Sequence, residues 1–156
     1  MGELVSIVYK PQDAAPSVEN YTRVPRQQAL LVAGYGIEND TKGGHSDRHL
    51  NIMAAHALEA LAEEGFRTAP GQLGEQLILA DVEIDSLPPG TRLQIGDAAC
   101  VELTEPRTGC GKFERHQGKL RQEAAGRLGM MARVVIGGEV AVGDPVTVVA
   151  EVAALK

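Results

Sequence analysis

The stretch from Arg92 to Thr104 reads RLQIGDAACVELT and has the pattern of two short β-strands joined by a turn. Polar and apolar side chains alternate over Arg92–Ile95, which is the period of a strand with one buried face. Gly96 and Asp97 are typical turn residues, and a mostly apolar segment follows from Ala99 to Thr104. The stretch therefore predicts two consecutive strands separated by a tight turn.

Similar short apolar runs occur on both sides of this stretch, each bounded by turn residues. Gly137-Gly138 is expected to form a hairpin-type turn, and Gly143-Asp144 repeats the Gly-Asp turn. Many short strands with such turns predict a mainly β protein, a closed or nearly closed β-barrel with one or two short helices. No linker divides residues 1–156, so a single domain is expected. The further expected strands are Leu4–Tyr9, Ala29–Ala33, His49–Met53, Leu77–Leu79, Met131–Ile136, Val140–Val142 and Val146–Val152.

Two segments have helical character. Over Ala54–Glu64 the apolar residues recur at helical spacing, and Gly65 follows as a stop signal. The charged segment Phe113–Ala125 is expected to form a second helix, although Gly118 weakens it by about 1 kcal/mol relative to alanine. By contrast, Ile37–Arg48 is too polar and too rich in glycine for a buried element and is expected to be a loop.

The composition excludes several classes of protein. The net charge is −6 and aromatic residues make up 3%, which argues against a surface that binds nucleic acid. No apolar segment approaches the roughly 20 residues needed to cross a bilayer, so no membrane association is expected. The chain starts without a basic stretch followed by an apolar run, and its two cysteines cannot form a disulfide framework. A cytoplasmic location is expected.

Cys110 is the leading candidate for chemistry. It lies in the segment EPRTGCGKF, between two glycines that leave its sulfur little covered. Arg107 and Lys112 are near in sequence, and a nearby cation favours the reactive thiolate. An ordinary glycine-rich turn is the alternative, since Glu105 and Glu114 could offset the positive charge. Cys100 is expected to be a small buried hydrophobic residue.

Further charged residues are weaker candidates. Arg115 and His116 are expected to lie on the solvated face of the second helix. Arg48, in the 37–48 loop, is a binding candidate that could line the opposite wall of a cleft. His45 and Asp47 have the chemistry of a base and its orienting partner, but a spacing of two in a loop leaves their role open.

Taken together, several motifs resemble the MOSC domain, named for the C-terminal domain of molybdenum cofactor sulfurase. The resemblance runs from roughly Leu4 to Val149. The loop at Gly36–Asp40 with Asp47-Arg48 is similar to the N-terminal motif of the family. The order and spacing of the motifs around one cysteine make the resemblance specific. Its strongest parts are Gly71–Leu77 (GQLGEQL), Leu93–Ala98 (LQIGDA), Val101–Arg107 (VELTEPR) and Gly129–Val134 (GMMARV).

The resemblance implies a β-barrel with a cleft that contains the cysteine. Members of the family carry sulfur as a cysteine persulfide or bind the molybdenum cofactor (molybdopterin), with the cysteine as a metal ligand in the reductase branch. Carried over by residue, Cys110 would be that cysteine, and Arg107, Arg48 and Lys112 would contact a pterin phosphate or stabilise the thiolate. Gln76 would be a cofactor contact where the family commonly has Asn. At position 109 this chain has Gly where the family often has Pro.

Three functions follow as hypotheses. The first is a sulfur carrier that acts through a Cys110 persulfide in molybdenum-cofactor or metal-sulfur-cluster metabolism, with a cysteine desulfurase as donor and a molybdoenzyme or cluster protein as acceptor. The second is a molybdenum-cofactor-dependent reductase of N-hydroxylated compounds. The third is a non-catalytic interaction barrel. Pyridoxal phosphate is not expected on this chain, because the full-length sulfurase carries the cofactor lysine in a separate domain. Whether the chain is an enzyme, its substrate and its oligomeric state remain open.

Overall fold

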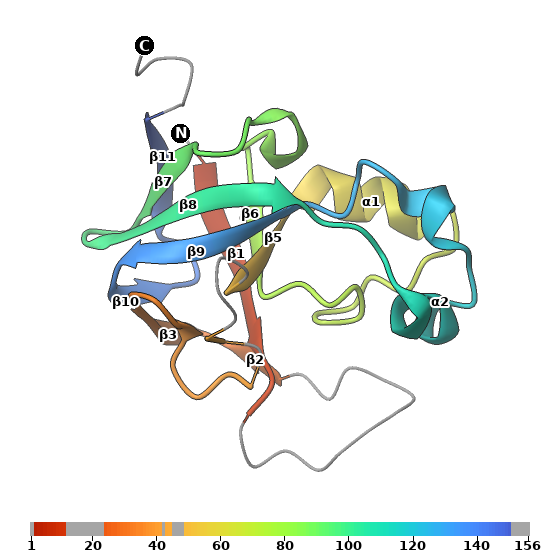
Figure 1. Cartoon of the computed structure of the whole chain (residues 1–156), viewed down its shortest axis with the longest axis horizontal. Helices are drawn as coiled ribbons and strands as arrows, with labels where there is room; N and C mark the ends of the chain where they lie inside the picture. Colours follow the sequence, from red (N-terminus) through yellow and green to blue (C-terminus); the bar gives the residue numbers. More distant parts are fainter. Residues whose placement is uncertain (1, 12–23, 42, 45–48, 151–156) are drawn as a thin grey trace.

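The computed structural model describes residues 2–11, 24–41, 43–44 and 49–150. This part of the chain is mainly β-structure, with two α-helices, α1 and α2, and two short 3-10 helices, η1 and η2 (Figure 1). The elements are β1 (Gly2–Tyr9), β2 (Val24–Arg26), β3 (Gln28–Val32), β4 (Gly36–Ile37), β5 (Leu50–Ala54), α1 (Ala55–Glu63), β6 (Leu77–Ala80), η1 (Ile84–Ser86), β7 (Arg92–Ile95), β8 (Ala99–Pro106), α2 (Gly111–Gln117), η2 (Arg121–Ala124), β9 (Met130–Ile136), β10 (Gly138–Ala141) and β11 (Pro145–Ala150).

Seven strands form a closed barrel, as the sequence predicted. Their order is β11-β7-β8-β9-β5-β6-β1, and β1 pairs with β11 to close the ring. All of these pairs are antiparallel except β5 and β6, which run parallel and are connected through α1. β2 adds to β1 at the edge, and β10, β3 and β4 form a separate three-stranded sheet.

Alternating residues of the strands fill the barrel. Leu93 and Ile95 of β7 and Val101 and Leu103 of β8 point into this core and are completely buried. Burying a side chain of this size contributes about 1.5–3 kcal/mol relative to leaving it exposed. The alternation of polar and apolar residues in Arg92–Thr104 predicted these strands because alternate side chains are buried in the barrel core.

A second apolar cluster packs outside the barrel, beneath α1, α2 and η2. Phe113 at the start of α2 is completely buried there, and its ring centroid lies 6.3 Å from that of Phe66. Both helices lie on the same side of the barrel (Figure 1). The other members of the cluster are Met53, Leu58, Leu61, Leu73, Ile78, Ala124 and Leu128.

The second helix differs from the one predicted over Phe113–Ala125. It begins at Gly111 and ends at Gln117, because Gly118 adopts a left-handed conformation with φ 69° and terminates it. The chain then turns back and forms η2 at Arg121–Ala124. Gly118 thus ends the helix rather than merely weakening it.

The predicted Gly137-Gly138 hairpin is also wrong. β9 ends at Ile136 and β10 begins at Gly138, so a single residue separates them, and β10 pairs with β3 instead of β9. A Cβ atom on Gly137 would lie 2.7 Å from the carbonyl oxygen of Leu31. Gly137 is therefore the residue at which the chain leaves the barrel and passes close to the backbone of the smaller sheet.

The remaining expected elements are observed with small shifts of their ends. Ala54–Glu64 appears as α1, and the end of the last expected strand, residues 151–152, lies outside the described residues. The same is true of His45, Asp47 and Arg48. None of the helices in the described part of the chain has the length and apolar character required to traverse a membrane.

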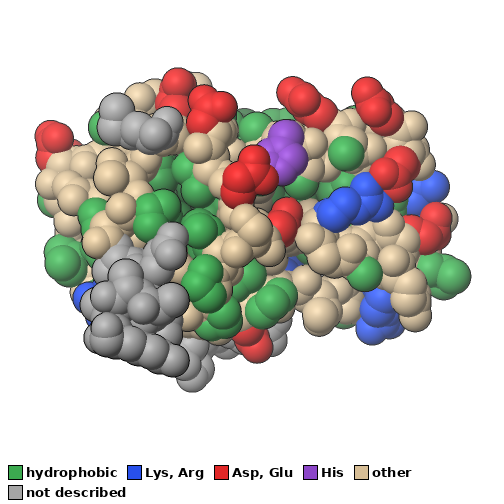
Figure 2. Space-filling view, turned by 90° about the horizontal axis from the view of Figure 1, so that it is seen from above, with side chains coloured by type: hydrophobic (Ala, Val, Ile, Leu, Met, Phe, Trp, Pro, Cys, Tyr) green, Lys and Arg blue, Asp and Glu red, His purple; other side chains and the backbone are tan. Residues whose placement is uncertain are grey.

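The charged side chains are unevenly distributed. Acidic side chains are scattered over the face shown in Figure 2, whereas Lys and Arg side chains gather mainly toward the end of the molecule that carries α1 and α2. That end also carries Cys110, directly before α2.

Candidate functional site

Cys110 lies at the N-cap position of α2 and is exposed to solvent. Its backbone is extended, and its carbonyl oxygen accepts a hydrogen bond of 3.0 Å from the N–H of Glu114 in the first turn of the helix. The preceding residue, Gly109, is buried, whereas the sulfur-bearing residue projects outward. The exposure predicted from the flanking glycines is thus present.

The second cysteine has the opposite environment. Cys100 lies on β8 and is only 7% exposed, as predicted for a small buried hydrophobic residue. Burial raises the pKa of its thiol, because the thiolate would lose its hydration. Of the two thiols, only that of Cys110 is accessible to a reaction partner.

Arg107 anchors the loop that carries Cys110. Its backbone N–H donates a 3.0 Å hydrogen bond to the carbonyl oxygen of Gly129, and its Nη1 donates to the carbonyl oxygen of Leu73. The guanidinium carbon lies 5.8 Å from the centroid of the Phe113 ring, a cation–π distance. Arg107 therefore connects the end of β8 with α2 and with the turn before β6.

That turn, Gly71–Gln76, is built around a completely buried carboxylate. Glu75 accepts hydrogen bonds from the backbone N–H groups of Gly71, at 2.7 Å, and of Leu73, at 3.2 Å. Gly74 has φ +79°, and a Cβ atom there would lie 2.7 Å from Nη2 of Arg107. The GQLGEQL motif thus forms a rigid base against which Arg107 packs.

Two side chains of α2 hold the helix to residues 67–72, the segment that leads into this turn. The amide of Gln117 accepts from the N–H of Arg67, at 2.7 Å, and donates to the carbonyl oxygens of Arg67 and Gln72, both at 3.0 Å. His116 is 6% exposed, and its Nε2 lies 2.7 Å from Oε1 of Gln72. The predicted solvated position of His116 is therefore wrong, because its ring packs against the 67–72 segment; Arg115 is exposed as predicted.

Arg121 is a charged neighbour of Cys110 that sequence reasoning missed. Its Nη1 donates to the carbonyl oxygen of Gly109 at 3.4 Å, and its Nε forms an ion pair of 3.0 Å with Glu114. Hydrogen bonding to Glu114 raises the pKa of Arg121, and negative charge on Cys110 adds to the effect. The signal that could have identified it is Gly118, since a helix that ends there lets the following residues fold back toward Gly109.

Gln76 lies in a buried chain of polar side chains. It is 4% exposed; its Oε1 accepts a 2.7 Å hydrogen bond from the N–H of Asn51, and its Nε2 donates to Asp40 at 3.4 Å. Asp40 in turn accepts from the N–H of Lys10 at 3.1 Å. Gln76 thus links β5 and β6 to the segment around Asp40, and a contact with a cofactor stays a prediction.

The structure brings some of the predicted site residues together. Cys110 and Arg107 lie on one loop, and the backbone of Lys112 forms part of the first turn of α2, although its side chain is outside the described part of the structure. Arg48 also lies outside the described residues. Arg121, whose Nη1 donates to the carbonyl oxygen of Gly109, adds a positive charge close to Cys110.

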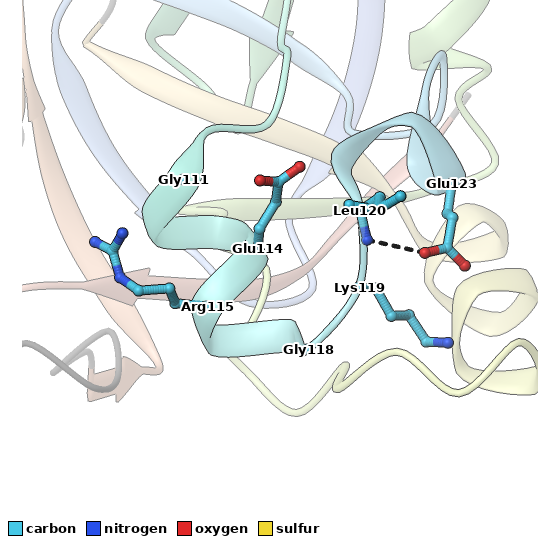
Figure 3. A pocket seen from close by; sticks show the side chains of 7 residues that line it. All are labelled: Gly111, Glu114, Arg115, Gly118, Lys119, Leu120 and Glu123. Atoms are coloured by element: carbon cyan, nitrogen blue, oxygen red, sulfur yellow. Dashed lines mark hydrogen bonds between the residues drawn. The ribbon is translucent and has the colours of Figure 1, made fainter.

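A shallow hollow of about 440 Å³ opens between α2 and η2, beside the start of the helix that follows Cys110 (Figure 3). Glu114 points into the space between the two helices, whereas Arg115 extends along the other side of α2. Glu123 accepts a 2.8 Å hydrogen bond from the N–H of Leu120 at the start of η2. The remaining lining residues are Gly111, Gly118 and Lys119.

This arrangement is suited to nucleophilic chemistry at sulfur. The exposed thiol is accessible to a reaction partner, and Nη1 of Arg121 is bonded to the carbonyl oxygen of the preceding Gly109. In its thiolate form such a group is a nucleophile and a metal ligand. A rigid base formed by Arg107, Glu75 and Gln117 holds the loop, so that the sulfur is presented from a defined position.

Comparisons with known proteins give one family and several similar structures. The sequence model of the MOSC domain matches residues 39–147. The structure is similar to YiiM from Geobacillus stearothermophilus, with a TM-score of 0.73 and 20% identity over 96% of this chain and 76% of that one. YiiM from Escherichia coli gives a TM-score of 0.72 and 20% identity over 96% and 71%. The YUAD protein from Bacillus subtilis gives 0.74 and 18% over 94% of both chains. No curated protein matches the sequence. At these identities the solved structures share the fold.

Proposed function

The chain belongs to the MOSC domain family, and from this premise we propose that it is a sulfur carrier that holds a persulfide on Cys110. The family is associated with the molybdenum cofactor, so the sulfur would serve molybdenum-cofactor or metal-sulfur-cluster metabolism. The observation that carries the proposal is the contrast between an exposed Cys110 beside Arg121 and a buried Cys100. A carrier needs one accessible sulfur that can accept a group and release it.

The transfer step needs no external oxidant. The Cys110 thiolate attacks the outer sulfur of a persulfide on the donor, which is expected to be a cysteine desulfurase. A new S–S bond forms to Cys110 while the S–S bond of the donor breaks, and the donor cysteine leaves as a thiolate. The outer sulfur crosses with the charge that it had on the donor, so a persulfide anion on the donor becomes a persulfide anion on Cys110, and atoms and charge balance. An acceptor nucleophile then takes that sulfur and returns Cys110 to its thiolate.

The second candidate function is that this chain is a reductase that binds the molybdenum cofactor. The exposed thiol of Cys110 favours it. A thiolate is a soft metal ligand, and the Arg121 guanidinium supplies positive charge beside it for an anionic group. Cys110 would hold the metal, which would supply two-electron redox chemistry. The predicted contact from Gln76 would require its amide to leave Asn51 and Asp40.

The two candidates make different predictions for the purified protein. The chain is incubated with a cysteine desulfurase and cysteine, then analysed by mass spectrometry under conditions that preserve persulfides. We expect a mass increase of one sulfur atom on Cys110, retained in Cys100→Ser and absent in Cys110→Ser. A co-purifying pterin with stoichiometric molybdenum would favour the reductase. If neither cysteine carries a persulfide and no pterin is bound, the proposal is overturned. The non-catalytic interaction barrel would then be the remaining hypothesis.

A further inference from the structure

Gly109 allows η2 to pack unusually close to the Cys110 loop. A Cβ atom on Gly109 would lie 2.9 Å from Cβ of Arg121 and 3.0 Å from Cδ1 of Phe113. The first distance is shorter than real Cβ atoms show and the second is at the limit, so a side chain at this position would require Arg121 to shift, together with the ring of Phe113. Proline, which the family often has here, would not fit in this arrangement. The observed position of Arg121 therefore depends on having glycine at position 109.

Glu114 fixes the direction of the Arg121 side chain. Oε2 of Glu114 accepts from the backbone N–H of Arg121, at 2.8 Å, and from its Nε, at 3.0 Å; Oε1 accepts from Nη2 at 3.2 Å. A guanidinium held by several hydrogen bonds has little freedom to rotate. The remaining nitrogen, Nη1, faces the carbonyl oxygen of Gly109, the residue next to Cys110.

The other described cations near Cys110 have different positions. Arg107 is held by the carbonyl oxygen of Leu73 and the ring of Phe113. Arg115 is exposed, and its Nη1 lies 3.5 Å from where a Cβ atom on Gly111 would be, so it approaches from the helix side. Arg121 combines a fixed direction with a contact to the carbonyl oxygen of Gly109, the residue directly before Cys110, and it interacts electrostatically with Cys110.

We infer that Arg121 is a specificity-determining residue that selects reaction partners with negative charge at the atom Cys110 attacks. This inference rests on the proposed function and names the class of donor: a compound whose transferable sulfur belongs to an anionic group. A thiolate that approaches such a donor experiences repulsion between like charges, and a guanidinium beside the sulfur offsets it. The same guanidinium stabilises the negative charge that remains on the outer sulfur after transfer.

A pair of alkylating reagents tests the inference on the folded chain. Iodoacetate and iodoacetamide alkylate thiolates by the same reaction and differ in charge, so the ratio of their rates does not depend on how much of the thiol is ionised. The ratio is measured in a Cys100→Ser background for the parent chain, Arg121→Gln and Arg121→Lys. We expect Arg121→Gln to lower the iodoacetate to iodoacetamide ratio by roughly three- to tenfold and Arg121→Lys to retain most of it. High salt should reduce the difference.

Sulfur uptake provides the second readout, with thiosulfate as an anionic donor. Cys110 attacks its outer sulfur, the S–S bond breaks, and sulfite leaves while the persulfide forms on the protein. We expect Arg121→Gln to slow this uptake by a factor similar to the change in the alkylation ratio. Arg133→Gln is the matched control, because Arg133 also pairs with a carboxylate, at 3.0 Å from Glu102, but lies on β9 of the barrel.

Gly109→Ala separates the position of Arg121 from its charge. The added Cβ atom displaces the arginine without removing it, so the ratio should fall as in Arg121→Gln while circular dichroism shows the fold intact. An unchanged ratio in Arg121→Gln, or a loss confined to Arg115→Gln, would overturn the inference and leave the persulfide on Cys110 untouched. The ratio of the iodoacetate and iodoacetamide rates can fall while no donor forms a persulfide on Cys110. That result would contradict the carrier function but would still support charge selection by Arg121.

Discussion

Gly74 and Arg107 pack against each other so closely that a Cβ atom on Gly74 would lie 2.7 Å from Nη2 of Arg107. The contact joins the turn before β6 to the end of β8, two segments that are far apart in the sequence. Because Arg107 also donates to the carbonyl oxygen of Leu73, the turn and the arginine hold each other in place. The loop that presents Cys110 begins directly after this contact.

Gly74→Ala should therefore destabilise the fold through both backbone strain and displacement of Arg107. Gly126 has the same φ, +79°, with nothing within 4 Å of its Cβ position, so Gly126→Ala is the matched control for strain alone. Strain should cost about 1–2 kcal/mol in each variant. Gly74→Ala should cost about 1 kcal/mol more, because the arginine loses its hydrogen bond. Urea denaturation measures the free energy of unfolding of both variants. An equal decrease in the two would show that the contact with Arg107 contributes nothing to stability.

Glu75→Gln should loosen the turn without removing side-chain volume. The carboxylate accepts hydrogen bonds from two backbone N–H groups, and an amide would present a donor to one of them. A buried mismatch of this kind costs about 1–3 kcal/mol. Hydrogen exchange of the Gly71 and Leu73 amides, together with the free energy of unfolding, checks the effect. Glu123→Gln, which alters an exposed hydrogen bond to Leu120, is the control and should change stability by less than about 0.5 kcal/mol.

The Glu114–Arg121 pair should make stability depend on pH in acid. Hydrogen bonding to Arg121 lowers the pKa of Glu114 from its ordinary value of 4.5. A carboxyl whose pKa is lower in the folded state contributes stability above its unfolded pKa and loses it as pH falls through the folded pKa. Stability should therefore decline below about pH 4.5, and less steeply in Glu114→Gln. In an Arg121→Gln background the effect of Glu114→Gln on the slope should shrink to the part that the backbone N–H of residue 121 supplies. An undiminished effect there would show that the Arg121 side chain contributes nothing.

The two cysteines should differ in reactivity in the native protein. Burial covers the Cys100 sulfur and raises the pKa of its thiol, whereas Cys110 is exposed. Iodoacetamide at neutral pH should modify Cys110 within minutes and Cys100 only after unfolding in guanidinium chloride. Peptide mapping by mass spectrometry identifies the modified residue. Modification of Cys100 first would contradict the assignment of Cys110 as the reactive thiol.

The barrel could be predicted from the sequence because each strand carries its own local signal. Alternation over Arg92–Ile95 and the Gly-Asp turn after it are read from neighbouring residues, and both are present in the structure. The prediction of a Gly137-Gly138 hairpin was wrong because β9 pairs with β8 and β10 pairs with β3. Which strands pair depends on the whole fold. Local patterns identify strands, but they do not determine which strands pair across the barrel.

The candidate site was only partly predictable for the same reason. Flanking glycines indicated that Cys110 is exposed, which is a local property. The role of Arg107 as an anchor depends on its contact with Leu73, which is distant in the sequence. The position of Arg121 depends on its contact with Gly109, made when the chain folds back after Gly118. An arginine in a sequence gives its charge but not its partner.

The closure of the barrel by β1 and β11 has a consequence for biosynthesis. Gly2 pairs with Val146, so of the seven barrel strands the earliest in the sequence waits for the latest before this edge is covered. Pairing across such a separation is slow, because the intervening chain must be ordered first. During translation the edge of β1 that later pairs with β11 is exposed to other nascent chains, and a chaperone that shields it would raise the yield of native protein.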